Sequence, residues 1–241
     1  MVDTKYQAIR AEINPKTGNQ VYRASDVKHP PVGWGVWIGE IVHNVRSALD
    51  GLVHQLAILN GAPAGARGTQ FPIFLYPRTR IAQGEKIAGF RDEGTGTMGS
   101  GVRMIKLLRD EHKACIERLQ PYQRGRGGKS NALYRLNEIS NADKHRLLQI
   151  AGAKVGISPI ATVWGADDDL SFAAWRFNTI LKDGTKLGEV APKVRVHPDF
   201  MPLIVFGEGC RPVKGLPIHL TLDRILEEAS EIIESFRPEF S

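Results

Sequence analysis

Apolar positions repeat with a helical period in four stretches of the chain. A spacing of three to four residues holds over about residues 36–59, 101–119, 130–149 and 221–237, which predicts four amphipathic helices. Asn60-Gly61, followed by Pro63, is typical of a helix end, so the first long helix is expected to stop there. A brief helix is also expected near residues 81–90, after a loop that contains the apolar sequence FPIF.

The apolar period changes to two between about residues 150 and 218. Such alternation predicts strands, here at IATVW, LSFAAWRF, KVRVH and LIVF, with Asp183-Gly184 at a hairpin turn. Near the N-terminus, YQAIRAEI and QVYRAS flank the turn-rich NPKTGN and predict a β-hairpin.

Together these elements predict an α+β fold, in which a bundle of about four helices carries an antiparallel β-sheet. The C-terminal helix is expected to pack back on the bundle, because one apolar stripe runs along it (Leu222, Ile225, Leu226, Ala229, Ile232, Ile233 and Phe236). We therefore expect a single domain over residues 1–241. Its helical part would cover about 33–149 and 221–238, and its β part about 5–24 and 150–218.

Composition and cysteine usage indicate a cytoplasmic protein. No stretch approaches 18 uninterrupted apolar residues, and the N-terminal MVDTKYQAIR lacks the apolar core of a signal peptide, so no membrane partner is expected. Cys115 and Cys210 are the only cysteines and lie far apart in the sequence. This fits a reducing compartment and excludes a disulfide scaffold or a cysteine-rich zinc site.

The formal net charge of +6 is concentrated in one segment. Residues 101–150 contain eleven Lys or Arg and five Asp or Glu, so the rest of the chain is balanced. A basic segment in an otherwise neutral protein indicates an anionic partner such as RNA, DNA or a nucleotide, or else a solvated surface kept for solubility. RGRGGKS adds Arg124, Arg126 and Lys129 in a glycine-rich loop that is suited to touching phosphates.

The first long helix has an unusual polar face. At about 100° per residue, one side of it is apolar (Ile38, Ile41, Val42, Val45, Ala48, Leu49, Leu52, Val53 and Leu56). The other side carries His43, Asn44, Arg46, Asp50 and His54 in place of the Lys and Glu typical of a plain solvent face. Glycines at positions 39 and 51 cost the helix roughly 1 kcal/mol each relative to Ala. The face is therefore a candidate functional site.

Polar residues also interrupt the apolar side of the helix predicted over residues 130–149. Leu133, Leu136, Leu147 and Leu148 define that side, and four polar residues project from it (Asn137, Ser140, Asn141 and Lys144). An unpaired buried polar group costs on the order of 1–3 kcal/mol, so these residues are expected to pair with the polar face of the first long helix. On helix 101–119, His112 is expected to be a satisfied core residue.

Four sequence motifs resemble those of a widespread set of bacterial and phage proteins. That set has the pattern HNLRSALDHL, then FPI, QPY and N-x-DKHR, which here correspond to His43–Leu52, Phe71–Ile73, Gln120–Tyr122 and Asn141–Arg146. More distantly, the chain is similar to the HEPN superfamily of helical bundles, many of which are RNases of toxin and antiphage systems. In their signature, four to six residues lie between an arginine and a following histidine. Gly51 stands at that position here, and His54 is the next histidine.

The HEPN resemblance implies an RNA-binding protein with metal-independent RNase activity and no cofactor, in a toxin or phage-conflict setting, and a homodimer. His54 or His145 would act as general acid or base, because the pKa of histidine lies near neutrality. Arg46 would bind the scissile phosphate, and Asp50 would orient a histidine or Arg46. Substrate would contact a further set of residues (His43, Asn44, Asn141, Lys144, Arg124, Arg126 and Lys129).

Two alternatives use the same residues. Asp50, His54 and His145 would form the most plausible metal trio, although their spacing matches no known ligand motif. The other alternative is a non-enzymatic helical module that binds nucleic acid or protein, in which the polar residues form a structural network. The glycine-rich GTGTMGSG matches a dinucleotide-binding pattern but lacks the preceding strand, so a connector is the better interpretation.

Overall fold

The structure is a computed structural model. It describes residues 8–27, 30–31, 33–82, 84–92, 100–145, 150–155, 161–164, 181–192, 195–198, 202–207, 210 and 213–241. The chain divides into two compact units, one formed by Met1–Val36 and Leu148–Leu220 and the other by Trp37–Leu147 and Thr221–Ser241. Helices and antiparallel strands together confirm the predicted α+β class. The single domain and the HEPN-like arrangement of the helices stay predictions.

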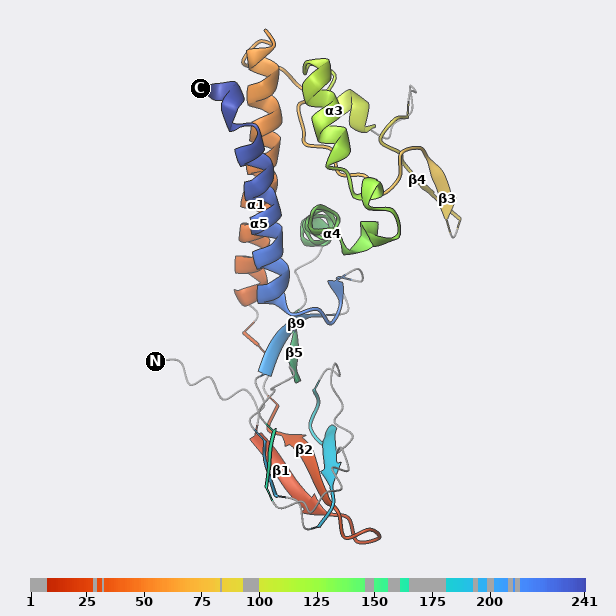
Figure 1. Ribbon diagram of the computed structural model, residues 1–241, viewed down its shortest axis with the longest axis vertical. Coiled ribbons are helices and arrows are strands. Elements are labelled where there is room, and N and C mark those ends of the chain that lie inside the picture. Colours follow the sequence, from red (N-terminus) through yellow and green to blue (C-terminus); the bar gives the residue numbers. More distant parts are fainter. Residues whose placement is uncertain are drawn as a thin grey trace. The chain divides into compact units, whose positions relative to one another are not determined.

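The β unit contains a three-stranded antiparallel sheet in the order β1-β2-β7, as Figure 1 shows in part. Its strands are β1 (Ala8–Ile13), β2 (Gln20–Ser25) and β7 (Lys186–Val190), so the predicted N-terminal hairpin is confirmed. Buried side chains of β2 and β7, together with the preceding Leu181, form a small apolar core (Tyr22, Ala24, Leu181, Leu187 and Val190).

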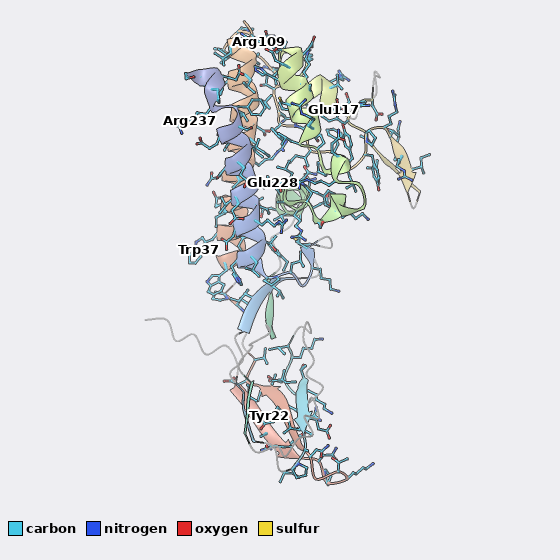
Figure 2. All side chains as sticks on the ribbon, viewed as in Figure 1. Tyr22, Trp37, Arg109, Glu117, Glu228 and Arg237 are labelled. Atoms are coloured by element: carbon cyan, nitrogen blue, oxygen red, sulfur yellow. The ribbon has the colours of Figure 1, made fainter. Side chains whose placement is uncertain are left out.

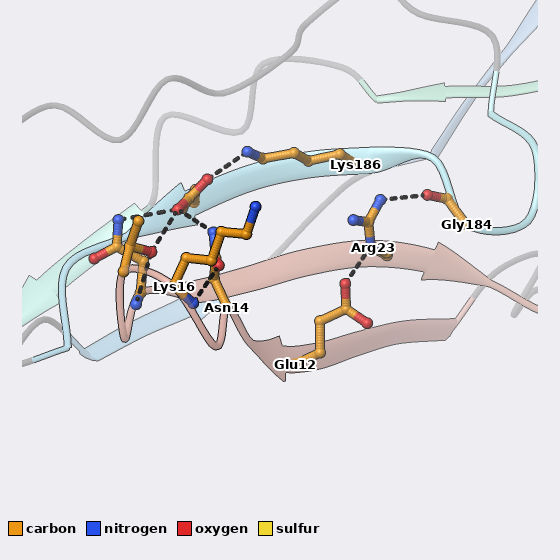
Figure 3. A network of polar contacts seen from close by, with 9 residues as sticks. Glu12, Asn14, Lys16, Arg23, Gly184 and Lys186 are labelled. Atoms are coloured by element: carbon orange, nitrogen blue, oxygen red, sulfur yellow. Dashed lines mark hydrogen bonds and ion pairs between the residues drawn. The ribbon is translucent and has the colours of Figure 1, made fainter.

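The turn between β1 and β2 is held by one carboxylate of β7 (Figure 3). Glu189 accepts hydrogen bonds from Asn19 Nδ2 at 2.9 Å and from Asn14 Nδ2 at 3.4 Å, and it pairs with Lys186. The hydrogen bond from Lys186, followed by that from Asn19, lowers the pKa of Glu189 to about 2. Because Glu189 lies on β7, these contacts connect strands that are far apart in the sequence.

The remaining described strands of this unit form two-stranded antiparallel ladders. β5 (Ile150–Val155) pairs with β9 (Pro202–Phe206), and β6 (Ala161–Trp164) pairs with β8 (Arg195–Pro198). Strands predicted at IATVW, KVRVH and LIVF are thereby confirmed. The predicted strand LSFAAWRF lies outside the described residues.

The second unit is mainly helical and contains most of the long α1 (Gly33–Leu59), together with α2 (Gly101–Met104), α3 (Asp110–Arg118), α4 (Ala132–His145) and most of α5 (Ile218–Ser235). Two 3-10 segments complete it, η1 (Pro121–Ser130) and the C-terminal η3 (Arg237–Phe240). Its core includes Leu49, Leu56, Ile116, Leu136 and Ile139, all fully buried. Ile225 and Ile232 of α5 are buried, and the ring of Phe236, directly after α5, meets that of His112 on α3.

Two of the predicted helices are wrong. In place of a helix near 81–90 there is a hairpin of β3 (Arg80–Ala82) and β4 (Glu85–Ile87), because Gly84 takes a φ of +81° in the turn. Helix 101–119 is broken into α2 and α3. The carbonyl of Leu107, in the break, accepts a hydrogen bond from Asn60 Nδ2 at 2.8 Å. Asp110 and Glu111 then begin α3, where acidic side chains favour a helix N-terminus.

The buried arc of α1 also differs from the predicted one. Ile41 is 39% exposed and Ala48 is exposed, although both were expected on the inner side, whereas Gly39 is buried. On α5, Leu226 is likewise 42% exposed. The inner face of α1 is thus rotated toward the glycine and arginine side, and this rotation brings part of the predicted polar face into the protein.

Candidate functional site

The polar face of α1 is covered by the loop of residues 69–74. Arg46, Asp50 and His54 lie four residues apart and so share one side of the helix. Asp50 Oδ1 accepts the backbone N–H of Phe71 at 2.8 Å, and Arg46 Nη2 donates to the carbonyl of the same residue at 2.6 Å. Both backbone groups of one loop residue are therefore satisfied by helix side chains. We call Arg46, Asp50 and the Phe71 backbone the Phe71 clamp.

Burial makes the clamp energetically important. Arg46 is 16% exposed and lies 3.3 Å from Asp50 Oδ1. Loss of hydration lowers the pKa of Arg46, while the charge of Asp50 acts in the opposite direction. An arginine nevertheless stays protonated in proteins, so the clamp contains a true ion pair. Arg46 Nη1 is buried and has no hydrogen-bond partner among the residues that the structure describes.

Gln120 holds the same loop from a second direction. This fully buried residue follows α3, and its Nε2 donates to the carbonyl of Pro72 at 2.8 Å and to that of Ile116 at 3.0 Å. Its Oε1 accepts the N–H of Phe74 at 3.0 Å. One amide thereby makes three hydrogen bonds, which leaves little of its capacity unused.

The loop held in this way is apolar but irregular. Phe71 and Pro72 are buried but belong to no helix or strand. Their backbone groups therefore lack the hydrogen bonds of regular secondary structure. A buried backbone N–H or C=O must find a partner, which explains why three polar side chains converge on so short a segment. Sequence reasoning did not single out Gln120. Its only signal was the motif Gln120–Tyr122, which stood in the resemblance without an assigned role.

His54, the remaining catalytic candidate on α1, contacts the beginning of the same loop. Its Nδ1 lies 3.2 Å from Thr69 Oγ1, and the side chain is partly buried. The structure thus brings Arg46, Asp50 and His54 together, as predicted, but their contacts are with loop 69–71. His43 and Asn44 lie on α1 as well and are exposed.

On α4 the predicted polar residues separate into buried and exposed ones. Ser140 is buried, Asn137 is partly buried and Asn141 is exposed, while the side chains of Lys144 and His145 lie outside the described residues. The expected contact between α1 and α4 occurs at a different pair. A Cβ built on Gly39 would lie 2.6 Å from Asp143 Oδ1, so the glycine makes room for this carboxylate.

Gly51 of α1 has no such explanation among the residues that the structure describes. A Cβ built on Gly51 would meet nothing within 4 Å among the described residues. Gly51 is exposed, and it stands where the resembling proteins have histidine. The cost of a mid-helix glycine is therefore not offset by packing at this position.

The basic residues predicted to touch phosphate lie on η1. Arg124 is exposed and its Nη2 lies 3.7 Å from Glu228 Oε1 of α5; Lys129 is also exposed. Gly125 takes a φ of +57° and bends the segment between them. The side chain of Arg126 lies outside the described part of the chain.

His112 is the buried histidine of the unit. Its Nε2 lies 3.2 Å from Glu239 Oε2, although the angles do not make this a hydrogen bond, and its ring packs edge-on against Phe236 at 6.0 Å. His112 is buried, as expected of a core residue, but both of its ring nitrogens lack a hydrogen-bond partner among the described residues, so the expectation that they are satisfied is wrong. The contact with Glu239 ties η3 to α3.

Within the described ranges, no three His, Cys, Asp or Glu side chains gather closely enough to hold a metal ion. Over the same ranges, no helix combines the length and the apolar character needed to cross a bilayer. Comparisons of the chain with protein-family models, curated proteins and solved structures find no match.

Proposed function

We propose that the chain is an RNA-binding helical module in which the polar face of α1 has a structural and not a catalytic role. The observation that carries this proposal is the Phe71 clamp. Arg46 Nη2 and Asp50 Oδ1 are both engaged by the backbone of a loop residue, at 2.6 and 2.8 Å. A scissile phosphate would have to compete with these short contacts for the same atoms.

RNA is the proposed partner because of the basic residues between α2 and α4. Among them Lys106, Arg118, Arg124 and Lys129 are exposed, and they belong to the segment that holds the whole net charge of the chain. Exposed cations that follow one another along a surface neutralise phosphates and release counterions, which gives salt-dependent binding.

Binding of a fluorescein-labelled single-stranded RNA, followed by anisotropy at 50 and 200 mM salt, tests this proposal. We expect binding that weakens at least about tenfold over this range, as contacts with several phosphates require. The double variant Arg124→Gln/Lys129→Gln should bind more weakly than wild type, whereas the control Arg237→Gln, an exposed change on η3, should not. Equal binding at both salt concentrations would contradict the proposal.

The competing function is the metal-independent RNA cleavage that the HEPN resemblance implies, with a homodimer as the active form. One observation favours it: His54 is only partly buried and lies on the same face as Arg46 and Asp50. Incubation of the protein with total RNA in EDTA decides between the two functions. We expect no cleavage. Cleavage by wild type that folded His54→Ala loses would replace the binding module by an RNase.

A further inference from the structure

A second polar cluster of the helical unit is built around Glu228 (Figure 2). Glu228 Oε1 accepts a hydrogen bond from Asn131 Nδ2 at 3.0 Å and lies 3.7 Å from Arg124 Nη2. Asn131 in turn accepts the N–H of Tyr134 at 3.2 Å and so caps α4. The carboxylate therefore marks the point where η1, the beginning of α4 and α5 meet, and its side chain is only 18% exposed.

Two further arginines belong to this point. Arg135 lies one turn after Asn131 on α4, and Arg224 lies one turn before Glu228 on α5, so each shares a helix face with one partner of the Asn131–Glu228 hydrogen bond. Burial and the charge of Arg224 both lower the pKa of Arg135. The Asn131–Glu228 hydrogen bond joins the start of α4 to α5, so Arg135 and Arg224 each lie one turn from the same contact between these helices. We call Arg124, Asn131, Arg135, Arg224 and Glu228 the Glu228 cluster.

The cluster has an excess of positive charge. It contains three guanidinium groups but one carboxylate, and that carboxylate already accepts from Asn131. Among the described residues, Arg135 Nε is buried without a hydrogen-bond partner, and Arg224 is exposed. A buried donor left unpaired beside a second cation is costly unless an anion binds there.

We propose that the Glu228 cluster is a binding site for a phosphate group, held by Arg135 and Arg224 with Arg124 at its edge. Planar guanidinium groups match the oxygens of a phosphate with pairs of charge-assisted hydrogen bonds, which a chloride ion cannot provide. The site deepens the proposed RNA binding and rests on it for the source of the phosphate. A free nucleotide or pyrophosphate would offer the same chemistry.

The test measures two ligands on the full chain: labelled single-stranded RNA by anisotropy, and inorganic pyrophosphate by isothermal titration at constant ionic strength. Arg224→Gln should weaken both about tenfold or more, the loss expected for a charge-assisted hydrogen bond. Arg135→Lys, which keeps the charge but not the fork, should also weaken both. Arg237→Gln is the matched control, since it removes an arginine that is exposed and paired with Glu234, and it should change binding less than twofold.

Glu228→Gln provides a test with the opposite sign. Glutamine can still accept from Asn131, but the site loses its negative charge, so pyrophosphate should bind several-fold more tightly. This result cannot come from a variant that merely fails to fold. Unchanged or weaker binding by Glu228→Gln would overturn the proposal.

The outcomes separate the site from the proposed function. If Arg224→Gln and Arg135→Lys bind RNA as wild type does, the site is wrong while RNA binding stands. If pyrophosphate binds and depends on Arg224 but RNA does not bind, the site stands and its ligand is a small phosphate compound. If neither ligand binds, both proposals are overturned.

Discussion

The Phe71 clamp and the Glu228 cluster both contain arginine, but they differ in what the guanidinium groups contact. In the clamp, Arg46 has its own carboxylate and a backbone carbonyl as partners, so its charge is compensated within the chain. In the cluster, Arg135 Nε is buried without a hydrogen-bond partner among the described residues, and the charge of Arg224 contributes to lowering the pKa of Arg135. Compensated charge stabilises a fold, whereas uncompensated charge is available to a ligand. Residue type alone therefore did not indicate which of the two sites binds a ligand.

The same distinction separates stability from binding. Changes in residues that hold loop 69–74 should lower the free energy of unfolding and leave RNA affinity of the folded protein unchanged. Changes in the Glu228 cluster should alter affinity with little loss of stability. The comparison would be wrong if a change at loop 69–74 altered RNA affinity, or if a change in the Glu228 cluster mainly lowered stability.

Gln120→Leu should cause the largest loss of stability. Leucine has a similar volume but makes none of the three hydrogen bonds, so the Phe74 N–H and the Pro72 carbonyl stay buried without partners. We expect the free energy of unfolding to fall by about 3 kcal/mol, since each orphaned buried group costs roughly 1–3 kcal/mol. Urea denaturation measures this loss. Gln123→Leu, an exposed change nearby, is the control; a loss no larger than that of the control would show that the amide does not hold the loop.

Asp50→Ala should cause the second-largest loss of stability. It leaves the Phe71 N–H and the partly buried Arg46 without their acceptor, and we expect a loss of about 2 kcal/mol, below the range for fully buried pairs because both side chains retain some exposure. Asp50→Asn keeps an oxygen for the Phe71 N–H and should lose less. Chemical denaturation of both variants, with RNA anisotropy on the folded proteins, checks the prediction. A tenfold loss of RNA affinity in stable Asp50→Asn would instead favour a role in the site.

Helical periodicity explains why part of this site was predicted from sequence. Positions 46, 50 and 54 must share a face once residues 36–59 form a helix, and in the structure all three side chains contact loop 69–71. The loop that covers them was not predictable in the same way. Its contacts with α1 and Gln120 join residues 15 to 48 positions apart, and no local pattern encodes such pairing. The pairing of Asn137, Ser140 and Asn141 with α1 stays a prediction.

The two wrong helix predictions had local causes. The spacing of Ile105, Leu108, His112 and Leu119 fits a single helix, but Asp110 and Glu111 also favour a new helix start, and the structure follows them. At Gly84 the preference for a positive φ outweighed a weak helical pattern. In both cases a turn or cap signal decided the structure against an apolar period.

Gly39 and Gly51 of α1 offer a smaller, paired test of where the surface of this helix is already covered by other side chains. At Gly51 a methyl group meets open space, so Gly51→Ala should raise the free energy of unfolding by about 0.5–1 kcal/mol. Gly39→Ala gains the same helix propensity but must displace the Asp143 carboxylate, so it should gain at least about 0.5 kcal/mol less. Thermal unfolding of the two variants side by side gives the difference. Equal gains would mean that Asp143 does not pack against Gly39.

Arg224→Gln should have the smallest effect on stability. Removing a cation from the Phe71 clamp would destabilise the protein, whereas removing the exposed Arg224 relieves repulsion of Arg135 and also loses attraction to Glu228, one turn away on α5. These two effects oppose each other, so we expect the free energy of unfolding to change by less than about 0.5 kcal/mol. Urea denaturation at 50 mM and 1 M salt, with Arg237→Gln in parallel, measures this change. A fall of more than about 0.5 kcal/mol would mean that Arg224 makes a stabilising contact within the chain, because exposed changes away from such contacts stay within that limit.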